Sequence, residues 1–254
     1  MQKLSLWISA LCLSLVFFSC SKSLESPSGS LETAMVASDA AIDLSNCKLR
    51  NIWSDNGGGT VKGTITYNSK GNPTKVLFEK NGTGNPDHYF FYDNQSRIVE
   101  WRQTYSGGTY TTERHRYVYN ASGVAIRDTA MYIEGDTITD VHTFTYDGQK
   151  RIVKENIKNI WNAGAPLNPQ RNPSFTYDAR GNLAVGGWKS SSYDNKVSAF
   201  RSHPVFQFIF KNYSVNNAAV QAKYNSKGMP LSLTPNNDRF FNNTVISKLA
   251  YDCQ

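Results

Sequence analysis

The stretch FTYDGQKRIVKE, residues 144–155, is one of six copies of a single short phrase in this chain of 254 residues. The others are ITYNSKGNPTKV from residue 65, FFYDNQSRIVEW from 90, YVYNASGVAIRD from 117, FTYDARGNLAVG from 175 and AKYNSKGMPLSL from 222. Asp or Asn always follows the shared tyrosine, and Gly stands three positions further on in four copies. Asp or Asn opens a type I turn by binding the backbone two residues on, and Gly closes a bulged hairpin. Each copy therefore predicts a strand, a tight turn and a second strand.

The residues before each tyrosine predict which face of the strand is buried. Two positions earlier the side chain is apolar in every copy: Ile65, Phe90, Tyr117, Phe144, Phe175 and Ala222. The positions between are often polar, as at Thr143 and Thr145. Because side chains alternate along a strand, the tyrosine face is expected to be aromatic and buried, and the opposite face largely solvated.

The spacing of the copies predicts the architecture. Successive tyrosines are 25, 27, 27, 31 and 47 residues apart, which leaves room for two strands per unit. Hairpins repeated with short connections form an antiparallel meander, and about twelve strands do not stay flat. We therefore expect an all-β fold with a coiled or barrel-like sheet and irregular insertions at 160–173 and 186–222.

The first twenty residues have the organisation of a secretion signal. Lys3 precedes an apolar run from Leu4 to Phe18, which is too short for a membrane span and suits an export signal. Ser19 and Cys20 follow and resemble a bacterial lipobox, which implies that Cys20 becomes the lipidated first residue. Phe17 departs from the Leu usual in lipoboxes, and ordinary signal cleavage nearby is the alternative.

The remaining cysteines predict a disulfide. Cys12 leaves with the signal, so Cys47 and Cys253 remain as one pair in an exported chain. The bond would close a loop of about 200 residues, for which the chain-entropy model gives on the order of 4 to 5 kcal/mol. Two free thiols are the alternative.

These signals divide the chain into a lipoprotein signal peptide at 1–19, a Ser-rich flexible tether at 20–45 and a single β domain at 46–254. Ser21 after Cys20 resembles lipoproteins sorted to the outer membrane, so we expect an envelope location, facing the periplasm or the surface. The net charge of +7 comes from basic residues scattered along the chain, and the sequence has no basic run of the kind that binds nucleic acids.

The repeated run also resembles the YD repeats of RHS-type proteins, in which Tyr-Asp is followed by Gly and an aromatic residue lies two positions before. YDARGNL from Tyr177 and YDNQSRI from Tyr92 are close to that pattern. The better match is to small YD-repeat-like lipoproteins of Gram-negative bacteria, and residues 193–217 look like the insertion that such proteins carry. The resemblance covers roughly residues 47–253 and implies architecture and location without an assigned activity.

Three histidines, His88, His115 and His142, each precede a repeat tyrosine by four residues and therefore share its face. Equivalent strands of successive hairpins are about 9.6 Å apart, so the three would span about 19 Å, whereas zinc needs nitrogens about 2.1 Å away. They are thus weak metal candidates, and the expected state is a bonded histidine at the rim of the core. We expect no metal and no cofactor.

Candidate catalytic groups are limited to carboxylates. No nucleophile elbow, zinc-protease motif or phosphate loop is present in the sequence. An acid/base pair for glycoside hydrolysis would have to come from the following residues: Glu100, Glu113, Asp128, Glu134, Asp136 and Asp140. The alternation places most of them in turns or on solvated strand faces, so we expect them to be exposed and the protein not to be an enzyme.

Aromatic side chains give the strongest binding hypothesis. Tyr89 and Phe91 lie on the face that is polar in the other copies, and Trp101 lies outside the repeated tyrosine positions. Exposed rings of this kind form a platform for a sugar or a protein partner. The alternative is that the two insertions cover them.

We therefore expect a lipid-anchored envelope protein with a non-enzymatic binding or structural role, whose partner is a polysaccharide or an envelope protein. The alternatives are a polysaccharide hydrolase that uses carboxylates on the sheet and an accessory factor of an RHS-like secreted system.

Overall fold

The computed structural model describes residues 47–55, 59–82, 85–133, 137–187, 190, 192–218, 223–233 and 245–253. The expected signal peptide, the lipidation site Cys20 and the tether lie outside these residues. One sheet of ten strands dominates, with β1 Cys47–Asp55, β2 Thr60–Tyr67, β3 Pro73–Phe78, β4 Asp87–Tyr92, β5 Ile98–Tyr105, β6 Tyr110–Tyr119, β7 Ala125–Tyr132, β8 Ile138–Tyr146, β9 Ile152–Asn162 and β14 Val245–Cys253. A short turn of 3-10 helix, η2 (Ser106–Gly108), joins β5 to β6.

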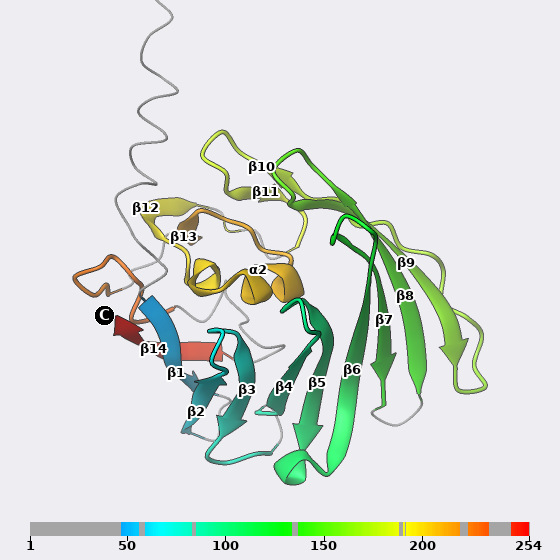
Figure 1. Cartoon of the computed structure of the whole chain (residues 1–254), viewed down its shortest axis with the longest axis horizontal. Coiled ribbons are helices and arrows are strands. Elements are labelled where there is room, and N and C mark those ends of the chain that lie inside the picture. The colour runs from blue at the N-terminus through cyan, green and yellow to red at the C-terminus, as the bar shows by residue number, and fades with distance from the viewer. Residues whose placement is uncertain are drawn as a thin grey trace, which may run out of the picture.

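The sheet is an antiparallel meander, as the repeats predict. Its strand order is β14-β1-β2-β3-β4-β5-β6-β7-β8-β9, so every neighbour pair except β14–β1 is consecutive in the chain. The sheet curves strongly and remains open, with β14 and β9 as its two edges (Figure 1). No helix in the described part of the chain is long and apolar enough to cross a membrane.

The predicted turn chemistry is confirmed in detail. In the second repeat, Asp93 Oδ1 accepts hydrogen bonds from the backbone N–H of Gln95 at 3.0 Å and of Arg97 at 2.9 Å. The position that carries Gly in four repeats has a positive φ in all six, including Ser96 at 64° and Lys150 at 62°. The backbone thus keeps one turn conformation even where the sequence lacks Gly.

The repeat tyrosines connect neighbouring hairpins through their hydroxyl groups. Tyr92 donates to the carbonyl oxygen of Pro73 at 2.8 Å, and Tyr119 donates to that of Ile98 at 2.7 Å. Three other tyrosines bond a backbone carbonyl in the same way: Tyr67 to Leu49, Tyr146 to Ala125 and Tyr177 to Ile152. A phenylalanine would pack on this face equally well, but it would leave these carbonyls without the phenolic donor.

The concave side of the sheet is covered by the insertion between the fifth and sixth repeats. This segment forms β12 (Tyr193–Val197), the 3-10 turn η3 (Ala199–Ser202), the short helix α2 (Pro204–Phe210) and β13 (Asn216–Ala218), which lie inside the curve (Figure 1). Phe206 of α2 packs edge-on against Phe90, and Phe208 packs against Tyr117 with ring centroids 5.0 Å apart. The face two residues before each tyrosine is therefore the core, as predicted.

The last two repeats depart from the regular meander. The segment before the fifth repeat follows β9 only through isolated bridges, such as Ile157 to Arg171, and the repeat itself is the small pair β10 (Thr176–Tyr177) and β11 (Leu183–Val185). Within the described residues, the sixth repeat forms one isolated bridge, Tyr224 to Pro230, outside the ten-stranded sheet. The hairpins of the first four repeats therefore form the continuous meander, whereas the fifth and sixth repeats lie beside it.

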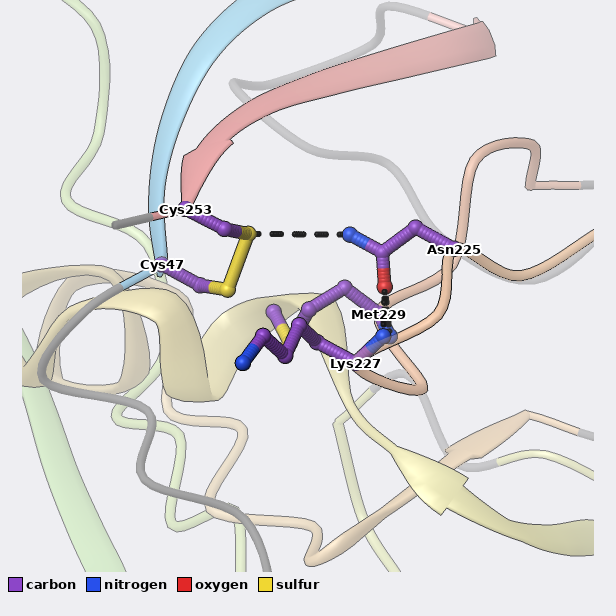
Figure 2. The surroundings of a disulfide bond; sticks show 5 residues. All are labelled: Cys47, Asn225, Lys227, Met229 and Cys253. Carbon is purple, nitrogen blue, oxygen red and sulfur yellow. Dashed lines mark hydrogen bonds between the residues drawn. A yellow bond between two sulfur atoms is a disulfide. The ribbon is translucent and has the colours of Figure 1, made fainter.

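A disulfide joins Cys47 and Cys253, 206 residues apart in the chain, as predicted from the cysteine count. The two cysteines are directly paired across β1 and β14. The turn of the sixth repeat lies against this bond: Asn225 Nδ2 is 3.6 Å from Cys253 Sγ, and Met229 packs beside Cys47 (Figure 2). The sixth repeat thus packs over the disulfide at the β14 edge, where Leu231 accepts a backbone hydrogen bond from Leu249 of β14.

Candidate binding site

A row of histidines and carboxylates crosses the concave face beyond the apolar core. In three consecutive repeats, the histidine four residues before the tyrosine uses Nδ1 to bond the side chain 13 residues later on the next strand. His115 Nδ1 lies 2.7 Å from Asp128 Oδ2, and His142 Nδ1 lies 2.7 Å from Glu155 Oε1. In the earlier repeat, His88 Nδ1 instead accepts a bond from Trp101 Nε1 at 3.2 Å.

His115 is held between two carboxylates. Its Nε2 lies 2.8 Å from Glu113 Oε1, while Nδ1 contacts Asp128. Burial alone would lower the pKa of His115, but the charges and hydrogen bonds of Asp128 and Glu113 raise it to about 9. His115 is therefore an imidazolium at neutral pH. Burial lowers the pKa of His88, by contrast, to about 3.

Glu155 ends the row beside a lysine. The ammonium of Lys211, which follows α2, lies 3.3 Å from Glu155 Oε1. Burial would raise the pKa of Glu155, but the hydrogen bond from His142 and the charge of Lys211 lower it. Glu155 is thus held as a carboxylate, and it accepts a hydrogen bond from His142 Nδ1.

Four members of this row, Glu113, His115, His142 and Glu155, line a cavity of about 570 Å³ between β5–β9, α2 and the 171–187 segment. Both polar and aromatic side chains line it, among them Tyr132, His142, Glu155, Arg171, Phe175 and Lys211. A second cavity of about 590 Å³ shares Tyr132 and Arg171 with the first and is also lined by Asp140. We call the two together the inner cleft.

The carboxylates that were expected to be exposed are buried. Asp128 is 1% exposed, Asp140 3% and Glu113 9%. Asp140 accepts from Asn159 Nδ2 at 2.9 Å and pairs with Arg171 at 3.0 Å. Glu113 and Asp140 each precede a repeat tyrosine by six residues, an even offset that places them on the inner face. Glu134 and Asp136 lie outside the described residues.

Glu100 is also buried, but unlike Glu113 and Asp140 it lies on the convex face of the sheet, where neighbouring side chains cover it. Arg114 bonds its carboxylate at 2.9 Å and Arg116 at 3.2 Å, and Arg102 also bonds it. Burial would raise the pKa of Glu100, but the hydrogen bonds of the three arginines lower it.

The histidines share one buried face, as predicted, but they lie closer together than the strand spacing suggests. The ring centroids of His115 and His142 are 6.5 Å apart. Side chains on a concave face converge, so their tips approach more closely than the strands that carry them. Within the described residues, no group of three or more His, Cys, Asp or Glu is arranged to hold a metal ion.

The expected platform of Tyr89, Phe91 and Trp101 is divided between the two faces of the sheet. Trp101 is 3% exposed and lies on the inner face, with its ring 5.8 Å from that of His88 and 4.8 Å from that of His115. It pairs across the strands with Phe90, whereas Tyr89 pairs with Arg102. Trp101 therefore cannot belong to the platform.

Tyr89 and Phe91 remain together on the convex face. Phe91 is 40% exposed, and the guanidinium of Arg102 lies 4.7 Å from its ring centroid. Tyr89 is half-buried, with burial and the charge of Asp87 raising the pKa of its hydroxyl. One face of the Phe91 ring is thus already occupied, which leaves a smaller surface for a ligand than the sequence predicts.

No protein-family model and no curated protein sequence matches the chain. Among solved structures, the crystal structure of TcdB2-TccC3-Cdc42 is similar with a TM-score of 0.30 and 12% identity, over 78% of this chain and 12% of that one. The crystal structure of TcdB2-TccC3 is similar with a TM-score of 0.31 and 16% identity, over 78% of this chain and 11% of that one. This chain therefore spans about a tenth of those chains, and the likeness to them is weak.

Proposed function

We propose that this protein is a lipid-anchored cell-envelope protein that binds a sugar unit of a glycan in the inner cleft without catalysing a reaction. The observation that carries the proposal is the cavity of about 570 Å³ on the concave face. Its volume lies within the range of about 300–1,000 Å³ typical of small-molecule sites. Its walls combine apolar rings with a few convergent polar groups, which is the usual composition of such a site.

The charges in the cleft favour a neutral polyhydroxylated ligand. The carboxylates of Glu113 and Glu155 face the same cavity as the cations of Lys211 and Arg171, and His115 adds a further positive charge. A strongly anionic or cationic ligand would leave groups of one sign unpaired, which is costly in a buried site. A hydroxyl group can donate to a carboxylate and accept from an ammonium, so it suits both.

Aromatic rings supply the apolar part of the site. Tyr132, Phe175 and Phe210 line the cavity together with the polar groups. The C–H faces of sugar rings pack well on such side chains, while their hydroxyls reach the surrounding polar atoms. This combination of rings and mixed charge supports a sugar more strongly than the single exposed Phe91 on the convex face.

The proposed lipid anchor is supported by the lipobox-like Ser19-Cys20 and by the Ser-rich segment that follows. A flexible tether of residues 20–45 would have a root-mean-square reach of about 30 Å, which lets the domain meet glycan near the outer membrane. A Cys20→Ala variant tests this directly. We expect the wild type in the membrane fraction and the variant in the soluble fraction; equal membrane retention would refute lipid anchoring at Cys20.

A hydrolase is the second candidate, because carboxylates share the cleft. Glu113 is bound by the imidazolium of His115, and Glu155 by His142 and Lys211. Carboxylates that are paired with cations in this way are poor proton donors, whereas glycoside hydrolysis needs one carboxylic acid. Release of new reducing ends from a bound glycan would establish the enzyme in place of the binding protein. An accessory role in an RHS-like system rests on the repeat resemblance alone.

Affinity electrophoresis through gels that contain envelope and plant polysaccharides tests the binding role. The cleft variant is Lys211→Met, which keeps the side-chain length and removes the ammonium. Its matched control is Lys158→Met, at an exposed position on the opposite face of β9. We expect retardation by at least one glycan, an approximately tenfold or greater weakening in Lys211→Met, and wild-type behaviour in the control. No retardation by any glycan would overturn the proposal, as would equal retardation of both variants.

A further inference from the structure

The two cavities of the inner cleft follow one another along β8. His142 lines the first cavity, whereas Asp140 and Ile138 line the second. The three residues are spaced by two, so they share the inner face of the strand, and His142 and Ile138 are about 13 Å apart along it. The cleft is therefore longer than a single sugar ring.

The wall beside β9 passes along the two cavities in the same order. The segment 168–175 is held to β9 by backbone hydrogen bonds, two of them between Arg171 and Ile157 at 2.8 and 3.0 Å. In chain order its lining residues run from the second cavity to the first: Asn168 and Pro169, then Arg171, then Pro173 and Phe175. Two separate elements thus arrange the cavities along one direction, as expected of one continuous groove.

Tyr132 and Arg171 mark the place where the cavities meet, because both residues line both of them. Arg171 Nη2 lies 3.0 Å from Asp140 Oδ2, and the side chain of Arg171 remains 61% exposed. A guanidinium has five N–H donors, so the contact with Asp140 orients the group and leaves donors for a ligand. The junction therefore combines an aromatic ring with a fixed, accessible cation.

The second cavity has the composition of a sugar position in its own right. Its volume of about 590 Å³ lies within the range of about 300–1,000 Å³ typical of small-molecule sites. The amide of Asn168 and the guanidinium of Arg171 are its hydrogen-bonding groups, and Ile138 and Pro169 supply apolar surface. Hydroxyl groups suit the former, while the C–H face of a sugar ring suits the latter.

From this arrangement we infer that the inner cleft binds an oligosaccharide segment of at least two linked units. One unit occupies the cavity beside Lys211, the next occupies the cavity beside Asn168, and Arg171 contacts the ligand where the two units join. The inference rests on the proposed binding function and adds the length of glycan that is recognised.

Isothermal titration calorimetry on the full-length protein in detergent micelles tests the second sugar position. The probes are cello- and manno-oligosaccharides of one to four units, with fragments of the same lengths from any polysaccharide that retards the protein in gels. The main variant is Asn168→Ala. It removes the side-chain amide and keeps the backbone N–H, which donates to Asn159 Oδ1 at 3.0 Å.

Two further variants make the test specific. Gln170→Ala is the matched control, because it removes an exposed amide from the same segment at a position that lines neither cavity. Lys211→Met alters only the first cavity. It should therefore weaken the binding of probes of every length, whereas Asn168→Ala should affect only those long enough to reach the second cavity.

We expect the affinity of the wild type to rise about tenfold or more from one unit to two. Asn168→Ala should weaken the binding of two and three units about fivefold and leave that of one unit unchanged, and Gln170→Ala should behave as the wild type.

Equal affinity of the wild type for one unit and for the longer probes would overturn the inference and leave the proposed function standing. Wild-type binding of the longer probes by Asn168→Ala would also overturn it, as would an equal loss for probes of every length. Binding of none of the probes, together with no retardation in glycan gels, would overturn both proposals.

Discussion

His88 and His115 occupy the same position in consecutive repeats but are bound by opposite kinds of partner. His88 accepts a hydrogen bond from the indole of Trp101, whereas His115 lies between the carboxylates of Asp128 and Glu113. Burial lowers the pKa of the first to about 3, while the carboxylates raise that of the second to about 9. One repeat scaffold therefore holds a neutral and a charged imidazole 27 residues apart in the chain.

The two histidines predict opposite effects of pH on stability. The folded pKa of His115 lies above its ordinary value of 6.5, so its contribution is complete below about pH 6.5 and is lost as the pH rises through about 9. The full shift corresponds to roughly 3 kcal/mol. The folded pKa of His88 is lowered, so the fold is destabilised as the pH falls from about 6.5 toward 3. Denaturant unfolding measured from pH 4 to 10 would show both slopes.

A His115→Gln variant separates the two effects. Without the titrating imidazole, the loss of stability between pH 6.5 and 9 should disappear, while the decline on the acid side remains. An alkaline slope of wild-type size in this variant would show that His115 is not the charged group.

Loss of the disulfide should destabilise the fold strongly. The Cys47–Cys253 bond closes a loop of 206 residues, for which the chain-entropy model gives on the order of 5 kcal/mol. We expect the Cys47→Ser/Cys253→Ser protein to unfold at a clearly lower urea concentration than the oxidised wild type. The wild type treated with a reductant is the control and should behave as the variant does; unchanged midpoints in both would exclude a stabilising role for the bond.

Each repeat tyrosine should contribute through its hydroxyl as well as its ring. Tyr119→Phe removes the donor to the Ile98 carbonyl at 2.7 Å, and we expect a loss of about 1 kcal/mol in the free energy of unfolding. Tyr177→Phe is the comparison, because its bond to Ile152 is long at 3.4 Å and should cost less. Equal costs at the two positions would indicate that ring packing, and not the hydroxyl, determines the choice of tyrosine.

Placing Gly at the positive-φ turn position should stabilise the protein in a repeat that lacks Gly there. Lys150 has a φ of 62°, which strains a residue with a Cβ, so Lys150→Gly should stabilise the protein by about 0.5 kcal/mol. The reverse change, Gly123→Ala at a φ of 75°, should cost about 1 kcal/mol, although the added Cβ meets no heavy atom within 4 Å. Destabilisation by Lys150→Gly would contradict a common turn conformation.

The local parts of the structure could be predicted from the sequence because each has a local cause. Asn or Asp, with a residue of positive φ three positions later, determines the turn. The alternation of side chains around the tyrosine determines which face is the core. The disulfide followed from counting cysteines. The sixth repeat has the same turn, with Asn225 bonded to Lys227 and Met229, yet it lies beside β14 and does not continue the meander. Turn chemistry therefore specifies a hairpin but not where it packs.

The candidate site was largely missed because it depends on the curvature of the sheet. The alternation placed His115 and His142 on the inner face, and the same count extended by two residues would have placed Glu113 and Asp140 there as well. Lys211 comes from a distant insertion, so no sequence pattern near Glu155 could predict its contact with that carboxylate. Trp101 was assigned to an exposed platform because its place across the strand from Phe90 becomes visible only in the register.

The most direct test of the account is a crystal structure of the protein soaked with the glycan that retards it most strongly in gels. The account predicts a sugar ring in the inner cleft, in contact with the ring of Tyr132 and the ammonium of Lys211. A sugar bound on the convex face over Tyr89 and Phe91, with the inner cleft free of it, would contradict the central claim.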